Sequence, residues 1–106
     1  MEIFVLPRFI RQYKKLPKTL KKLAQEKEKI FRENPFDHRL KTHKLKGGLS
    51  EFWAFSINHS YRIIFDFQDE KTVRFYQIGD HDIYDGVPNI STICRKFLYP
   101  GILSLK

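Results

Sequence analysis

The spacing of apolar residues predicts a strand and two helices in the first third of the chain. Residues 2–6 form a short apolar run closed by Pro7, which is typical of a strand. Residues 8–16 carry apolar side chains at helical spacing, and Pro17 ends that pattern and can open another helix. Over residues 18–33 a second apolar stripe has Lys27 as its one polar interruption and consists of Leu20, Leu23, Ala24, Ile30 and Phe31. We therefore expect an amphipathic helical hairpin with one face on a core.

The remaining pattern predicts strands. Residues 34–50 form a polar, basic loop with room for a short strand at 42–45. Three strand-like segments follow at 52–57, 61–67 and 72–78, and the first two have side chains that alternate between two faces. Short polar turns separate the segments, which indicates an antiparallel meander. The order β-α-α-β-β-β predicts an α+β domain: a four-stranded, mostly antiparallel sheet with the helical hairpin on one face. Residues 1–85 form this domain. The tail at 86–106 shows no firm period, although Asn89 could cap a short helix there, so the pattern does not define its structure.

Composition narrows the cellular setting and the kind of partner. A chain of 106 residues with 42% hydrophobic residues can form one core but not two. The single cysteine, Cys94, excludes an internal disulfide and fits a reducing cytoplasm. We expect no signal peptide and no membrane span. The net charge of +8 favours a polyanion, nucleic acid before an acidic protein or an anionic membrane surface, although such a charge can also serve solubility alone.

A basic cluster at residues 39–46 is the first candidate for chemistry. Nearby positive charge disfavours the imidazolium form of His43, and a neutral imidazole beside cations can act as a general base next to a phosphate. The alternative is a solvated loop that happens to be basic. The cations that could hold phosphate are Arg39, Lys41, Lys44 and Lys46.

Arg62 is the second candidate, because it lies in the middle of an aromatic-rich strand. Its fork of donors suits a phosphate on which charge develops. The alternative is a structural pair with Asp66.

The third candidate is the segment that follows the last strand, residues 79–84. His81 lies between Asp80 and Asp82, whose carboxylates favour the protonated ring that a general acid requires. Tyr84 could stack on a base or donate its hydroxyl. The alternative for His81 is a turn residue bonded to its own loop.

Together these residues fit RNA cleavage without a metal or another cofactor. A base at His43 would activate the 2′-hydroxyl, an acid at His81 would protonate the 5′-oxygen, and Arg62 would bind the charge between them. No metal-binding motif such as H-E-x-x-H is present.

The chain resembles the RelE/ParE superfamily of type II toxins, over about residues 1–85. The resemblance depends on the order of elements and on three motifs: H-K-L-K-G-x-L-x-x-F-W at 43–53, Y-R-I-I-F at 61–65, and I-G-D-H-D-I-Y at 78–84. It implies a sheet backed by two helices, with a concave basic face. It also implies an mRNA-cleaving toxin, which can act on the ribosome, and an antitoxin partner with an acidic segment.

In the RelE/YoeB-like branch, an acidic residue holds the general-base position that His43 occupies here. The strand arginine of that branch corresponds to Arg62, and its C-terminal histidine and tyrosine correspond to His81 and Tyr84. A second arginine of the branch is replaced by Ser56. That replacement keeps two alternatives open: a ParE-like inhibitor of DNA gyrase, which needs no acid–base pair, and a catalytically weak module that binds RNA or protein.

Overall fold

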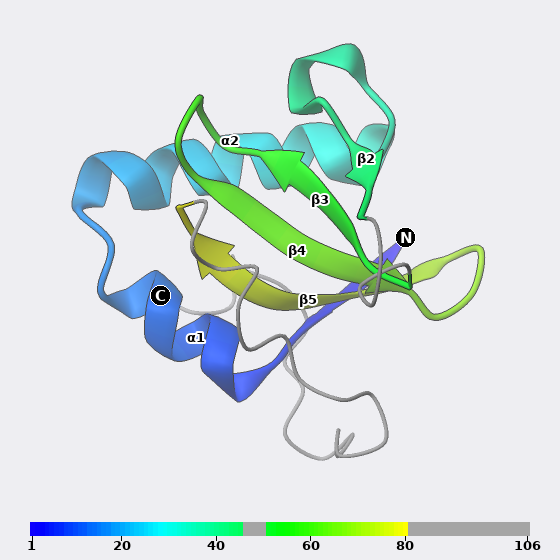
Figure 1. Ribbon diagram of the computed structural model, residues 1–106, viewed down its shortest axis with the longest axis horizontal. Helices are drawn as coiled ribbons and strands as arrows, with labels where there is room; N and C mark the ends of the chain where they lie inside the picture. The colour runs from blue at the N-terminus through cyan, green and yellow to red at the C-terminus, as the bar shows by residue number, and fades with distance from the viewer. Residues whose placement is uncertain (46–50, 81–106) are drawn as a thin grey trace.

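The strands and helices follow one another in the predicted order in the part of the chain that the computed structural model describes, residues 1–45 and 51–80 (Figure 1). The elements are β1 (Glu2–Val5), α1 (Pro7–Lys14), α2 (Lys18–Glu33), the 3₁₀ turn η1 (His38–Leu40), β2 (His43–Lys44), β3 (Trp53–Ser56), β4 (Arg62–Phe67) and β5 (Thr72–Gly79). The α+β class is therefore confirmed. The predicted tail at 86–106 lies outside the described residues.

Within residues 1–45 and 51–80, the sheet has five strands in the order β1-β5-β4-β3-β2, one more than the four predicted. The fifth is β2, a two-residue strand that pairs with β3 at the sheet edge and lies in the segment 42–45, where the sequence left room for a short strand. The pairing continues one residue further, because the Leu45 N–H donates to the Phe52 carbonyl. Among these strands only β1 and β5 run parallel, and the other neighbours are antiparallel, as expected.

Both helices pack on one face of the sheet around an aromatic core. Phe31 of α2 lies 4.8 Å from Phe55, 4.9 Å from Phe65 and 5.5 Å from Phe75, measured between ring centroids. Phe9 of α1 lies 5.6 Å from the same Phe75 ring. Aromatic side chains bury much area per residue, so this cluster gives a short chain a substantial core.

The polar residue that enters the apolar stripe of α2 is Glu28, so the prediction that assigned this place to Lys27 was wrong. Glu28 is fully buried, at the helical spacing that also buries Ala24 and Phe31, whereas Lys27 is half-buried. Its Oε1 accepts a hydrogen bond from Arg32 Nη2 one turn later, at 3.4 Å. The pair provides the carboxylate with a donor inside the helix–sheet interface.

Helix α1 also supports the end of β5. Strand β1 stops at Val5, so the second half of β5 extends beyond its parallel neighbour. There the Gln12 side chain accepts a hydrogen bond from the Ile78 N–H at 2.9 Å, which replaces the missing strand. The strand end that leads to the predicted site is thus held by a helix.

Candidate functional site

The strand register identifies which predicted residues share a face of the sheet. Residues directly opposite each other in antiparallel strands project to the same side. Arg62 lies opposite Ser56 and Gly79, and His43 lies opposite Ala54. These residues project away from the helices, onto what we call the far face. The sheet therefore brings His43 and Arg62 to one side.

The centre of the far face is buried, and its accessible parts include the predicted site. Ala54, Ile64 and Tyr76 are fully buried. By contrast, His43 is exposed and Arg62 is half-buried. Among the described residues, the far face is thus open to a ligand at the end that carries the candidate base and the candidate clamp.

His43 has a ring orientation that suits a general base. Its Nδ1 lies 3.0 Å from the Lys41 carbonyl oxygen. Because a carbonyl can only accept, Nδ1 carries the hydrogen in this contact, and in the neutral ring Nε2 keeps its lone pair. That nitrogen is the one that could take a proton.

Arg62 does not form the structural pair that the sequence offered as its alternative role. Asp66 instead accepts hydrogen bonds from Arg74 Nε at 3.1 Å and Nη2 at 2.7 Å. The Arg62 Nε is buried, and no hydrogen-bond partner for it exists among residues 1–45 and 51–80. A buried donor without a partner is costly, so this N–H favours an acceptor that the described residues do not supply.

A buried polar cluster lies further along the far face. Asp66 also accepts from the Tyr76 hydroxyl at 3.0 Å, and both partners of the Asp66–Arg74 pair are nearly inaccessible. Burial raises the pKa of the Tyr76 hydroxyl far above its ordinary value, and the Asp66 carboxylate raises it further. The sequence analysis did not find this cluster, but a signal for it was present. Asp66 and Arg74 are equally distant from residue 70, at the centre of the hairpin turn, and are therefore opposite each other in β4 and β5.

A bulge in β5 positions the tyrosine of this cluster. Gln77 pairs with Ile64 and Phe75 pairs with Phe65, so Tyr76 has no partner residue in β4. The extra residue lets Tyr76 project onto the far face, where its ring packs edge-on against Phe52 at 4.9 Å. Phe52 is thus a buried packing residue, which is the common role of an aromatic side chain at the start of a strand.

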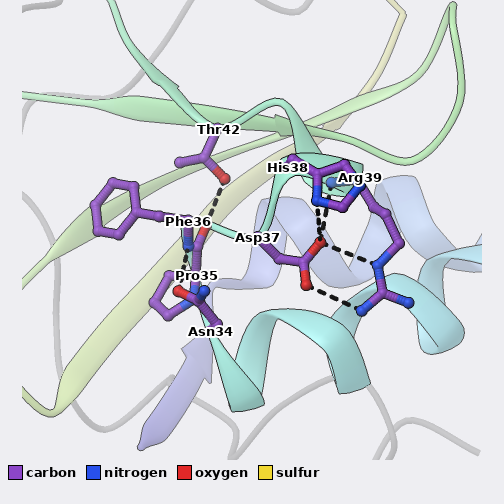
Figure 2. Close-up of polar contacts among 7 residues, drawn as sticks. All are labelled: Asn34, Pro35, Phe36, Asp37, His38, Arg39 and Thr42. Atoms are coloured by element: carbon purple, nitrogen blue, oxygen red, sulfur yellow. Dashed lines mark hydrogen bonds and ion pairs between the residues drawn. The ribbon is translucent and has the colours of Figure 1, made fainter.

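The loop between α2 and β2 is organised by two short side chains (Figure 2). Asn34 Oδ1 accepts from the Phe36 N–H, and Asp37 Oδ1 accepts from the Arg39 N–H, so Asp37 caps η1. The Asp37 carboxylate also binds the Arg39 side chain at 3.0 and 2.9 Å, as the paired dashed lines of Figure 2 show. This pairing holds the pKa of Asp37 well below its ordinary value.

The predicted phosphate-binding residues differ in where they lie. Arg39 is occupied by Asp37, so its charge is already compensated. Lys41 is exposed and has a left-handed backbone (φ 52°), which ends η1 and turns the chain into β2. Lys44 is exposed and lies opposite Trp53, on the helix side of the sheet, away from His43.

Lys46, His81 and Tyr84 lie outside the described residues. Their predicted roles therefore stay predictions. Gly79 pairs with Arg62 at the end of β5, and His81 follows it by two residues, which is a covalent reach of about 7 Å between Cα atoms.

Among residues 1–45 and 51–80, no three or more His, Cys, Asp or Glu side chains gather in a way that could hold a metal ion. No helix in this part of the chain has both the length and the apolar character needed to cross a bilayer.

The fold is shared with several solved toxin structures. A YoeB/ParE toxin from Agrobacterium tumefaciens is 16% identical with a TM-score of 0.64, over 76% of this chain and 99% of that chain. The YoeB–YefM complex from Staphylococcus aureus matches with 24% identity and a TM-score of 0.63, over 74% and 94%. YafQ from Escherichia coli matches with 17% identity and a TM-score of 0.60, over 79% and 97%.

No protein-family model matches the sequence, and no curated protein matches it. At these identities, the structural matches are evidence for the fold alone. The matching structures are YoeB, ParE and YafQ toxins, as the sequence motifs led us to expect. The chain thus has the fold of the RelE/ParE superfamily of toxins.

Proposed function

We propose that the chain is the toxin of a type II toxin–antitoxin system and that it cleaves mRNA. The observation that supports this most directly is the position of His43 and Arg62 on the same accessible part of the far face. In addition, the Arg62 Nε has no partner among the described residues. Two strand spacings of about 4.8 Å separate β2 from β4, so the Cα atoms of these residues lie roughly 10–12 Å apart. Two long side chains and one phosphate can fill that gap.

In the proposed reaction, His43 Nε2 takes the proton of a ribose 2′-hydroxyl. The 2′-oxygen then forms a bond to the adjacent phosphorus, and the bond from phosphorus to the 5′-oxygen breaks. Arg62 binds the non-bridging oxygens as charge develops on them. His81 gives its proton to the leaving 5′-oxygen, and Tyr84 orients or stacks the substrate. The products are a 2′,3′-cyclic phosphate and a 5′-hydroxyl.

The test is to incubate the full chain with translating ribosomes and, separately, with free RNA, and to map the RNA ends. We expect cyclic-phosphate ends from the wild type. Because a positioned acid or base contributes about 10²–10⁴-fold, His43→Ala and His81→Ala should each slow cleavage by that order. Arg62→Lys keeps the charge but loses the fork of donors, so it should also be slow.

His59 provides the matched control. It is an exposed histidine in the turn between β3 and β4, three residues before Arg62, and it has no role in the proposed reaction. His59→Ala should cleave at the wild-type rate. Equal rates for the wild type, His43→Ala and His81→Ala would refute the assignment of the base and the acid.

A second candidate is a ParE-like inhibitor of DNA gyrase. It is favoured by Ser56, which lies directly opposite Arg62 where the RNA-cleaving branch is expected to carry a second arginine. This function predicts that the protein blocks supercoiling and leaves RNA intact. A supercoiling assay run beside the RNA assay distinguishes the two.

We also propose that a cognate antitoxin with an acidic segment controls the protein. The Staphylococcus aureus YoeB structure is a complex with YefM, and the net charge of +8 here suits an acidic partner. The reading frame next to this one should encode a short acidic protein. Co-expression should yield a stable complex in which RNA cleavage is lost.

A further inference from the structure

The positive charge of the protein is concentrated in one short segment. Residues 3–25 contain seven lysines and arginines and no aspartate or glutamate. The other 83 residues contain 13 Lys and Arg and 12 Asp and Glu, so they are almost neutral. The net charge therefore belongs to the helical hairpin and not to the far face that carries the proposed cleavage site.

Six of these cations gather where α1 ends and α2 begins, and we call them the cationic corner: Arg11, Lys14, Lys15, Lys18, Lys21 and Lys22. Three residues connect the helices there. The Tyr13 ring of α1 receives Lys21 Nζ at 5.9 Å from its centroid, and its hydroxyl accepts from Gln25 at 2.8 Å. These contacts place the last turn of α1 beside the first turns of α2.

The cationic corner is accessible and takes part in no ion pair within the part of the chain that the structure describes. Five of its members are exposed, and Lys21 is half-buried. Within residues 1–45 and 51–80, the ion pairs involve Arg32, His38, Arg39 and Arg74 and no member of the corner.

The stability of helix α2 does not explain why lysines lie in its first turn. A helix N-terminus carries partial positive charge, which favours acidic residues in the first turn. Helix α2 has no acidic residue there, and its N-cap, Pro17, makes no side-chain cap bond. Lys18 and Lys21 thus lie where the helix dipole disfavours cations.

The corner is remote from the proposed site. In Figure 1, the connection between the helices lies at the opposite end of α2 from β2. Helix α2 has 16 residues, which span about 24 Å. A ligand at the corner would therefore not occupy the His43 end of the sheet.

We propose that the cationic corner is a second nucleic-acid contact, which binds the phosphate backbone of double-helical RNA away from the point of cleavage. This rests on the proposed function. Single-stranded RNA is usually bound by exposed aromatic rings, and Tyr13, the aromatic residue in the corner, is buried. An acidic protein would use apolar anchors, but among the described residues the large exposed apolar side chains are Met1 and Phe36, outside the corner.

The test is direct binding of the full chain to a labelled 20-base-pair RNA duplex, measured by fluorescence anisotropy over a range of salt concentrations. The triple variant Lys14→Gln, Lys18→Gln and Lys22→Gln removes three cations of the corner. The slope of log K against log salt is negative, and each lost phosphate contact should reduce its magnitude by about 0.9. We expect the magnitude of the slope to fall by about 2–3 and the Kd to rise about tenfold or more at 0.1 M salt.

The control triple variant, Lys27→Gln, Lys29→Gln and Lys71→Gln, removes the same charge outside the corner. It should change the Kd and the slope far less. Equal weakening by both triple variants, or an unchanged slope in the corner variant, would overturn the proposal. So would loss of binding to a poly-glutamate peptide by the corner variant while duplex binding stays intact.

Cleavage of a short single-stranded RNA separates this inference from the proposed function. Such a substrate fills only the site on the far face, so the corner variant should cleave it like the wild type. If neither protein cleaves it, the proposed function fails, and duplex binding still decides the role of the corner.

Discussion

Two ion pairs in this protein have nearly the same geometry and very different burial. Asp66 accepts from Nε and Nη2 of Arg74 at 3.1 and 2.7 Å, and Asp37 accepts from the same two nitrogens of Arg39 at 3.0 and 2.9 Å. The side chains of the first pair are 5% and 9% accessible, and those of the second are 19% and 53%. They therefore allow the same substitution to be compared in two environments.

Asp66→Asn leaves the Arg74 charge buried without its counter-charge. Removal of one partner from a buried pair costs about 3–5 kcal/mol. A domain of this size is stable by about 5–15 kcal/mol, so the variant should lose a large share of that stability. With a urea m-value of about 2 kcal/mol per molar, a loss of 3 kcal/mol lowers the unfolding midpoint by about 1.5 M.

The matched control is Asp37→Asn. Water screens this exposed pair, and asparagine still caps η1, so the midpoint should hardly move. The double variant Asp66→Asn with Arg74→Met removes the buried charge as well and should recover part of the loss. Urea unfolding followed by circular dichroism measures all of them. Equal midpoints for Asp66→Asn and Asp37→Asn, or a double variant less stable than the single one, would refute the reasoning.

Three further predictions concern the core, the polar cluster and the site. Phe31→Ala should lower the free energy of unfolding by about 3–5 kcal/mol in the same urea assay, whereas the exposed Phe36→Ala should cost far less. The pKa of Tyr76 is raised in the folded state, so the contribution of Tyr76 to stability is present below the ordinary tyrosine pKa and is lost as the pH rises above that value. In an alkaline titration, Tyr76→Phe should therefore unfold at a higher pH than the wild type. Ser56→Arg adds a guanidinium opposite Arg62 and should speed RNA cleavage in the end-mapping assay; an unchanged rate would mean that the second arginine is not what limits this chain.

Local pattern was sufficient to predict much of this fold. Periodicity and the break at Pro17 predicted a helix over residues 18–33, which are the observed bounds of α2, and the strands predicted at 61–67 and 72–78 match β4 and β5 within one residue. These features depend on a few neighbouring residues, which a sequence displays directly.

Features that depend on pairing between distant residues were harder to predict. The burial of Glu28 depends on which face of α2 meets the sheet, and the partner of Asp66 follows from the hairpin register. The common face of His43 and Arg62 needs the alignment of three strands, which no short window contains. The sequence could identify these residues as candidates but could not predict that they share a face of the sheet.

The unpaired residue in β5 has a consequence for how the length of this strand can vary. Removal of Tyr76 would leave Phe75 and Ile78 facing the helices and Gln77 between them on the other side, in unbroken alternation. A shortening of β5 at Tyr76 therefore sacrifices the contact with Asp66 but leaves the core and the Arg62–Gly79 pairing in place. Evolution or protein engineering can therefore change the residue count of β5 at this position without moving the core side chains to the other face of the sheet.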